Sequence, residues 1–356
     1  MFLALKELRY EKTRYALVAG IMFLISFLVL FVSGLAQGLA FNNASSLETM
    51  NVDHFVLDED AEHQLTRSLV SDEDQQVIQD GEVEATPFGL HMTMLIREEA
   101  SNVDVAMMSV DLNSPIAPTV IEGQTPSEGQ ALIHESIQEE GIEIGDVVTD
   151  NASDMEFEVS GFTEDQTFSH APIMHVHEDD WREMRDGEFI VSAAALHGSD
   201  EEAAQIDEQL ADSEVITLDE ALAGIPGYSA EQGSLTMMIV FLYIIAAFVL
   251  AAFFYVITIQ KLNQFGIMKA IGSPVSVLAK SLLVQVMVLS AVSLTLAIVV
   301  TLGASQIMPE GLPFQLTGTM VAISAGLFFL TAIVGSLLSL YKVAKVDALE
   351  AIGGGK

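Results

Sequence analysis

Apolar residues are concentrated in four uncharged blocks. These blocks cover residues 15–37, 232–260, 281–309 and 311–341. Each holds the roughly 20 apolar residues that a helix needs to cross a hydrocarbon layer about 30 Å thick. A buried core helix would explain one such block but not four. The pattern therefore predicts transmembrane helices at 16–38, 235–259, 278–303 and 318–341.

A long segment between the first and second blocks has mixed polarity and predicts an α+β domain. Ser71 is suited to cap a short helix that runs to about Gln79. Alternating or β-rich runs predict strands at Val103–Leu112, in Gly141–Val148, in Phe157–Phe162, at Phe189–Ala195 and at Val215–Leu218. Ala131–Glu140 predicts a helix or a strand followed by a helix, and Asp200–Ala211 predicts an acidic helix.

Charge separates the same regions. Of 50 acidic and 14 basic residues, 45 acids and only four arginines lie in residues 39–231, a balance of −41 against +5 for the rest. The ten remaining bases flank the predicted spans on one side, which the positive-inside rule assigns to the cytoplasm. Residues 39–233 are then a large extracellular domain, and both termini are cytoplasmic in the plasma membrane of a prokaryote. The first apolar block is longer than a signal-peptide core, so we expect an uncleaved anchor.

Composition excludes several classes of protein. The chain has no cysteine, which excludes disulfides, thiolate metal sites and a cysteine nucleophile. Its acidity argues against nucleic-acid binding through a basic face. The acidic surface fits either salty or acidic surroundings or cation capture. His175 and His177 could share one face of a strand as a metal site, or could simply be partly exposed histidines. No resident cofactor is expected.

Three short segments on the predicted cytoplasmic side carry further signals. Residues 1–15 predict an amphipathic helix on the membrane surface. Residues 260–277 extend a membrane helix, break at Gly272 and Pro274, and begin the next helix. Residues 342–352 predict a short terminal helix.

These segments resemble those of a known transporter family. Gly266-Ile-Met-Lys-Ala-Ile-Gly-Ser273 and Ala344-Lys-Val-Asp-Ala-Leu-Glu-Ala-Ile352 resemble motifs of MacB/FtsX-type ABC transporter permeases, which also carry a large outer domain between the first two spans. The opening 18 residues, Ile225–Gln232 and 253–272 are more similar to heme-exporter permeases of the HrtB type. The resemblance implies four transmembrane helices, 16–38 and three more within 234–356, with an inserted α+β domain.

The resemblance also implies partners. A separate cytosolic ATP-binding subunit would hydrolyse ATP, since this chain has no Walker motif and would not itself be an enzyme, and two permeases would form a homodimer in the lipid membrane. The break at 260–277 would couple to that subunit through Phe265, Gly266, Met268, Lys269, Gly272 and Pro274. The alternative is a plain loop on the membrane surface. Gly34 and Gly38 could pack two helices closely, either between the two permeases or within one.

A heme exporter needs an apolar slot, an iron ligand and polar groups for the propionates. The outer ends of the first two spans offer candidates: Phe41, Met50, Tyr228, Glu231, Met237, Met238 and Phe241. Met238 or Glu231 would ligate the iron and the aromatic rings would stack on the porphyrin. The alternative is interfacial aromatic residues and methionines that fill a core.

The function expected from this resemblance is ATP-driven export of heme from the membrane, as detoxification. The same fold could instead export an antimicrobial peptide, a macrolide or a lipid. It could also act as an FtsX-like transducer that moves a cell-wall hydrolase and transports nothing. An intramembrane enzyme is disfavoured because the spans hold no acid or histidine.

Overall fold

The computed structural model divides into two compact units, residues 1–38 with 234–356, and residues 39–233. We call them the membrane unit and the sheet unit. The structure describes residues 10, 12–81, 83–96, 102–185, 187–260, 266–268, 271–272, 274–308 and 312–345. The predicted surface helix at 1–15 and the terminal helix at 342–352 therefore lie largely outside the described residues.

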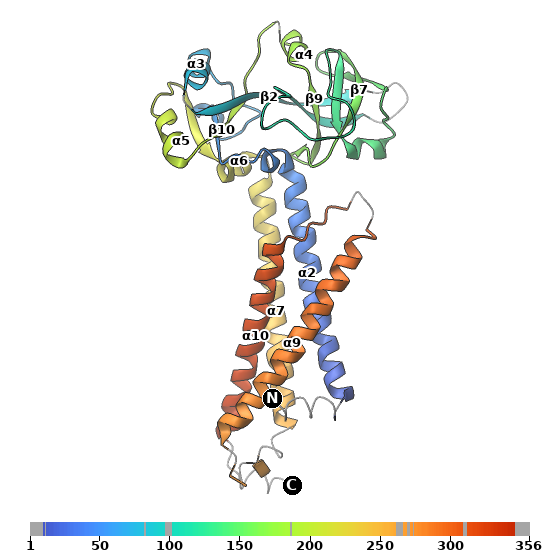
Figure 1. Ribbon diagram of the computed structural model, residues 1–356, viewed down its shortest axis with the longest axis vertical. Helices are drawn as coiled ribbons and strands as arrows, with labels where there is room; N and C mark the ends of the chain where they lie inside the picture. The colour runs from blue at the N-terminus through green and yellow to red at the C-terminus, as the bar shows by residue number, and fades with distance from the viewer. Residues whose placement is uncertain are drawn as a thin grey trace. The chain divides into compact units, whose positions relative to one another are not determined.

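Four long helices make up the membrane unit, and Figure 1 shows them running side by side. They are α2 (Lys12–Thr49), α7 (Tyr228–Gln260), α9 (Val275–Ser305) and α10 (Gly318–Lys345). Each contains a stretch long and apolar enough to span a membrane, which confirms the four predicted spans. The first two helices are longer than predicted because their polar ends, such as Asn42-Asn43, remain helical within the sheet unit.

The helices pack through an apolar core with few polar links. Met22, Leu250, Val286 and Ala332 represent the four helices in this core, and all are buried. A buried hydrogen bond joins Tyr15 Oη to Gln285 Oε1 at 2.9 Å, across α2 and α9. Polar links of this kind fix which helix faces meet, because an unpaired polar group in a hydrocarbon interior costs free energy.

The sheet unit is built on one large mixed sheet of eleven strands. Their order is β11-β1-β10-β2-β3-β9-β5-β7-β4, with β6 paired to β2 and β7, and β8 paired to β9. The strands are β1 (His54–Asp58), β2 (Glu84–Ile96), β3 (Val103–Val110), β4 (Val120–Gly123), β5 (Gln130–His134), β6 (Val147–Asp150), β7 (Glu156–Thr163), β8 (Thr167–Phe168), β9 (Ala171–Val176), β10 (Ala193–His197) and β11 (Ser213–Thr217).

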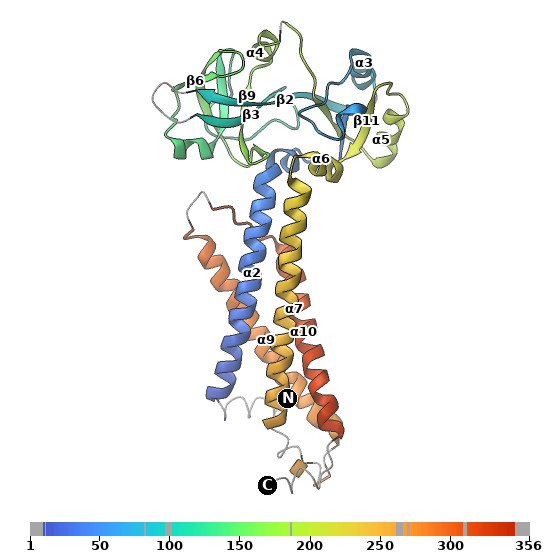
Figure 2. The same cartoon turned by 180° about the vertical axis from the view of Figure 1, so that it is seen from behind.

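Short helices cover both faces of this sheet. They are α3 (Asp72–Asp80), α4 (Glu178–Glu183), α5 (Asp200–Asp207) and α6 (Leu218–Gly224), with 3₁₀ turns at Glu59–Ala61 and Glu135–Glu140. Figures 1 and 2 both place α4 and α6 on opposite sides of the sheet. Alternate residues of β2 and β3 accordingly enter two different cores, Leu90 and Met108 on the side of α6 and Leu95 and Met107 on the side of α4.

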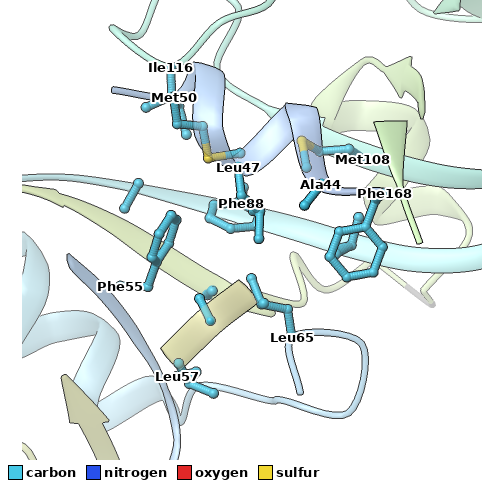
Figure 3. Packing of buried hydrophobic residues seen from close by; sticks show 14 of the residues in the cluster. Ala44, Leu47, Met50, Phe55, Leu57, Leu65, Phe88, Met108, Ile116 and Phe168 are labelled. Atoms are coloured by element: carbon cyan, nitrogen blue, oxygen red, sulfur yellow. The ribbon is translucent and has the colours of Figure 1, made fainter. Parts of the chain in front are cut away.

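The core on the α6 side is completed by the last turns of α2. Figure 3 shows Ala44, Leu47 and Met50 of this helix packed against Phe88 and neighbouring side chains of the sheet. Ala44 has a non-helical backbone (φ −147°, ψ 24°), so α2 bends there. The sheet unit therefore buries the helix end as part of its own hydrophobic core.

Most predicted elements of the sheet unit are confirmed, with three shifts, one of which is that the strand expected in Gly141–Val148 begins only at Val147. The helix expected to reach Ala211 ends at Asp207. The buried carboxylate of Asp74 accepts the backbone N–H groups of Ala211 and Asp212, which holds them away from a helical path. The strand expected at 189–195 begins only at Ala193, because the buried Val191 lies in an irregular segment where its carbonyl accepts the Val70 N–H. Ala131–Glu140 is a strand followed by a 3₁₀ turn.

Candidate functional site

Glu231 lies at the centre of a polar cluster in the sheet unit. Its carboxylate sits in the first turn of α7, with a side chain 24% exposed. Its Oε2 atom accepts a hydrogen bond from Asn43 Nδ2 at 2.9 Å and contacts His170 Nε2 at 3.0 Å. Among the described residues no donor reaches Oε1 within hydrogen-bond distance. Two side chains therefore hold one carboxylate oxygen, while the other makes no such contact within the described residues.

The backbone around the bend in α2 holds Asn43 in place. The Asn43 carbonyl accepts the Ser169 N–H at 2.7 Å, and the Asn42 carbonyl accepts the Thr167 hydroxyl at 2.8 Å. Ser45 Oγ also accepts the Thr167 N–H at 2.9 Å. These bonds tie the end of α2 to the β8–β9 hairpin, and so bring Asn43 and His170 to the same carboxylate.

The hairpin turn itself is strained. Both central residues, Ser169 (φ 52°) and His170 (φ 62°), adopt the left-handed region. A two-residue turn of this kind favours Asn-Gly, because side chains with a Cβ resist positive φ. Strain at functional sites persists when the surroundings over-determine it, and here the Ser169 N–H bond and the His170–Glu231 contact do so.

The other predicted heme-site residues divide between the two units. In the sheet unit, Tyr228 packs against the apolar core, Phe41 is half-buried, and Met50 is 4% exposed inside that core. Met50 thus packs in the core of the sheet unit, and its role as a heme contact stays a prediction. In the membrane unit, Met237, Met238 and Phe241 are 59%, 46% and 57% exposed on α7. Sequence reasoning missed Asn43 and His170, since neither lies in a motif and only the fold brings them to Glu231.

Gly34 and Gly38 pack within a single chain. A Cβ on Gly34 would lie 2.5 Å from the ring of Phe314, and one on Gly38 would lie 2.4 Å from the backbone of Pro313. The Gln315 N–H donates to the Gly34 carbonyl at 3.0 Å. Within this one subunit the two glycines let the segment before α10 approach α2, and a role between two subunits stays a prediction.

The predicted coupling segment is described only in part. Phe265 and Lys269 lie outside the described residues. Residues 266–268 form a helical turn, with Gly266 buried and Met268 half-buried. Gly272 has φ +92°, which only glycine adopts at low cost, and Pro274 caps the start of α9.

Two isoleucines of this segment were not predicted. Ile267 and Ile271 are 55% and 77% exposed, and the Ile271 N–H donates to the Ile267 carbonyl. That i to i+4 bond places both side chains on one helical face. Two exposed apolar side chains on one face of a polar turn are typical of a segment that contacts a partner protein. The alternation of apolar residues in the motif was the sequence feature that could have predicted them.

The histidine pair does not form a metal site. His175 is buried in β9, where its Nε2–H donates to Gln166 Oε1 at 3.1 Å, and burial lowers its pKa to about 3. His177 instead caps α4, with its Nδ1 accepting the Asp179 N–H. Within the described part of the chain, no group of three or more His, Asp or Glu side chains could hold a metal ion.

Comparisons with known proteins agree on the kind of protein. Residues 236–348 match the family described as FtsX-like permease C-terminal. Two proteins provisionally named hemin transport system permease protein HrtB are similar over their full length: one from Staphylococcus haemolyticus, 33% identical over 99% of both chains, and one from Staphylococcus epidermidis, 34% identical over 100% of both. An uncharacterised ABC transporter permease of Mycobacterium tuberculosis is 23% identical over 99% of both chains.

A solved structure resembles part of the chain. The extracellular domain of the noncanonic ABC-type transporter YknZ from Gram-positive bacteria aligns with a TM-score of 0.33 and 13% identity, covering 46% of this chain and 98% of that one.

Proposed function

The chain belongs to the FtsX-like ABC transporter permeases, as a full-length relative of the HrtB proteins, and from this premise we propose that it exports hemin. The observation that best supports this proposal is the arrangement of the Glu231 carboxylate. Asn43 and His170 contact its Oε2 atom, and among the described residues no hydrogen-bond donor reaches Oε1. A carboxylate oxygen is a competent ligand for iron, and the relatives' names supply the substrate class.

The remaining candidate residues would complete the hemin site. Tyr228 offers an aromatic ring one helical turn from Glu231, and Phe41 offers a second one on α2. Met238 is the alternative iron ligand, with Met237 and Phe241 as exposed apolar contacts on α7. The sheet unit holds only four arginines, so the propionates would gain little from ion pairs. Such a site favours release over retention.

Energy would come from a separate cytosolic ATP-binding subunit, and two permeases would act together as a homodimer. We place the contact with the ATPase at residues 260–277. The exposed Ile267 and Ile271 are added to the contact residues expected from the sequence, Phe265, Met268 and Lys269. Helices α2 and α7 each contain residues of both the membrane unit and the sheet unit. The ten bases beside the spans assign the termini to the cytoplasm and the sheet unit to the extracellular side.

The decisive experiment uses the purified permease–ATPase complex in lipid nanodiscs. Hemin should shift its own Soret absorption on binding and should stimulate ATP hydrolysis. Glu231→Gln removes the charge but keeps the shape, so it should abolish the stimulation and the tighter-binding part of the Soret shift. Glu201→Gln, at the exposed start of α5, is the matched control and should leave both unchanged.

Two outcomes would contradict this proposal in different ways. If micromolar hemin gives the wild-type complex neither a Soret shift nor stimulation, hemin is not the substrate. If the wild type responds and Glu231→Gln responds equally, the iron ligand lies elsewhere, and Met238→Ala then tests the alternative. Export itself would be tested with inside-out vesicles, in which ATP should move hemin from the membrane into the lumen.

A further inference from the structure

A cleft of about 650 Å³ opens on the sheet unit beside the Glu231 cluster. Met92 and Met94 of β2 and Asp104 of β3 contribute its floor, Asn151 comes from the β6–β7 turn, and Ser169 with His170 comes from the β8–β9 turn. A volume of this size suits a drug-sized or cofactor-sized molecule, for which pockets of about 300–1,000 Å³ are usual.

The two methionines occupy one face of β2. Residues two apart on a strand point to the same side, so Met92 and Met94 continue the row begun by Phe88 and Leu90 in the core on the α6 side. Phe88 and Leu90 are buried, whereas Met92 is 37% exposed and Met94 is half-buried. The row of apolar side chains therefore extends beyond the part of the sheet that helices cover, and forms an open apolar surface.

His170 connects this cleft to Glu231. Its side chain is 42% exposed, lines the cleft and contacts Glu231 Oε2 at 3.0 Å. His170 therefore belongs both to the Glu231 cluster and to the lining of the cleft. All of these residues lie within the sheet unit.

The donor set of the cleft suits iron porphyrin. Thioether sulfur and imidazole nitrogen are the protein ligands that hold heme iron in many proteins. Methionine side chains are also flexible and polarisable, so they pack against a flat apolar ring. Among the residues that the structure describes, no lysine or arginine lines the cleft, so propionates would face water through its open mouth. The cleft should therefore bind hemin more weakly than a site with basic partners.

We propose that this cleft is a second hemin site, reached after Glu231, in which Met92 or Met94 ligates the iron and His170 supplies an imidazole. The proposal rests on hemin export as the function and adds a second binding site to the export path. Hemin would pass from the carboxylate to a weaker thioether site on the sheet unit and then to the surroundings. His170 would then have two alternative partners: the Glu231 carboxylate when the cleft is empty, and the iron when hemin occupies the cleft.

The test is a hemin titration of the full permease in nanodiscs, followed in the Soret region and in the red region, where ferric heme with a thioether ligand has a weak band. The wild type should show two phases, with the thioether band growing in the weaker one. Met92→Leu/Met94→Leu should lose that band and weaken the second phase by about tenfold or more, while the first phase is kept. Leucine preserves the volume, so folding is retained.

Matched controls separate ligation from packing. Met155→Leu and Met184→Leu change methionines that pack on the opposite core, and both should keep the two phases and the band. Glu231→Gln should lose the first phase and keep the thioether band.

Each other outcome has a definite meaning. A wild type that binds no hemin overturns this proposal together with hemin export. A wild type that binds hemin, with Met92→Leu/Met94→Leu unchanged in both phases and in spectrum, overturns the second site and leaves export standing. If Glu231→Gln loses both phases, the cleft is not a site in its own right.

Discussion

At the scale of single residues, His175 links the stability of the sheet unit to pH. His175 belongs to β9, which pairs with β3 and β5, and burial of its imidazole lowers its pKa from 6.5 to about 3. The unfolded chain therefore binds a proton that the folded one excludes. Above about pH 6.5 the neutral His175 does not lower the free energy of unfolding. Below that pH the free energy of unfolding falls by about 1.4 kcal/mol for each pH unit, until the pH reaches the pKa of the folded state.

This dependence can be measured with the protein's own fluorophore. Trp181 is the only tryptophan and is buried in the sheet unit, so its emission reports unfolding of that unit. Denaturant titrations between pH 7 and pH 4 should show falling stability in the wild type. His175→Gln keeps a donor for Gln166 but cannot titrate, so its profile should be flatter. Equal slopes in the two proteins would show that another group, such as His134 with a pKa of about 4, controls the response.

Ile271 provides a residue-scale test of coupling. Its side chain is 77% exposed on the turn between α7 and α9. If it inserts into the ATP-binding subunit, Ile271→Ser should reduce hemin-stimulated ATP hydrolysis about tenfold or more, since a desolvated anchor residue contributes 2 kcal/mol or more to an interface. Hemin binding by the permease alone should be unchanged. Ile307→Ser, which alters an 84% exposed isoleucine beyond the other end of α9, should preserve stimulation. Normal stimulation in Ile271→Ser would move the contact elsewhere.

At the scale of elements, the turn of the β8–β9 hairpin lowers the stability of the sheet unit but places His170 beside Glu231. Ser169→Asn/His170→Gly would give the turn residues that prefer positive φ at both positions. Removing the backbone strain should raise the stability of the sheet unit by about 1 kcal/mol. The same change deletes the contact between His170 and Glu231. We therefore expect higher stability together with weaker hemin binding, seen in the same preparation by Trp181 fluorescence and Soret titration.

A control for this trade is Glu62→Gly. Glu62 also has positive φ (53°) but belongs to the turn after β1, where its carboxylate pairs with the exposed Arg67. It should gain stability and leave hemin binding unchanged. If the hairpin variant binds hemin as tightly as the wild type, His170 does not position the carboxylate.

Because Pro313 and Phe314 lie close to α2, alanine substitutions at three glycines of this helix should change the stability by different amounts. Gly38→Ala would force a Cβ against the Pro313 backbone, which cannot rotate away, so we expect a loss of about 1–3 kcal/mol. Gly34→Ala would meet the Phe314 ring, which can turn, and should cost less. Gly20→Ala meets no atom within 4 Å and should stabilise α2 by up to about 1 kcal/mol. Thermal unfolding in detergent measures the order, and equal losses at the three positions would contradict the packing.

At the scale of the whole molecule, some features were predictable because they depend on local pattern. Four apolar blocks specify four membrane helices, and Ser71 before three acids specifies the start of α3. The site was only half predictable. Glu231 stands out beside an apolar block, but its partners Asn43 and His170 lie 188 and 61 residues away in sequence. Pairing across such distances is set by the order of strands, and no periodicity in the sequence records that order. Met50 shows the converse, since a methionine after a span suits a ligand or a core equally well until the fold buries it.

The distribution of charge predicts how salt affects hemin capture from water. The chain carries a formal charge of −36, and residues 39–231 alone carry −41. Hemin bears two propionates, so long-range repulsion should slow its approach at low ionic strength. Screening lengths fall from about 30 Å at 0.01 M salt to about 8 Å at 0.15 M, so added salt should speed association several-fold. Stopped-flow absorbance on nanodiscs of zwitterionic lipid measures this rate. The dimethyl ester of hemin lacks the propionate charges and should show little dependence. A rate that falls with salt for hemin but not for the ester would mean that the propionates meet basic residues first, and that the acidic surface does not govern capture.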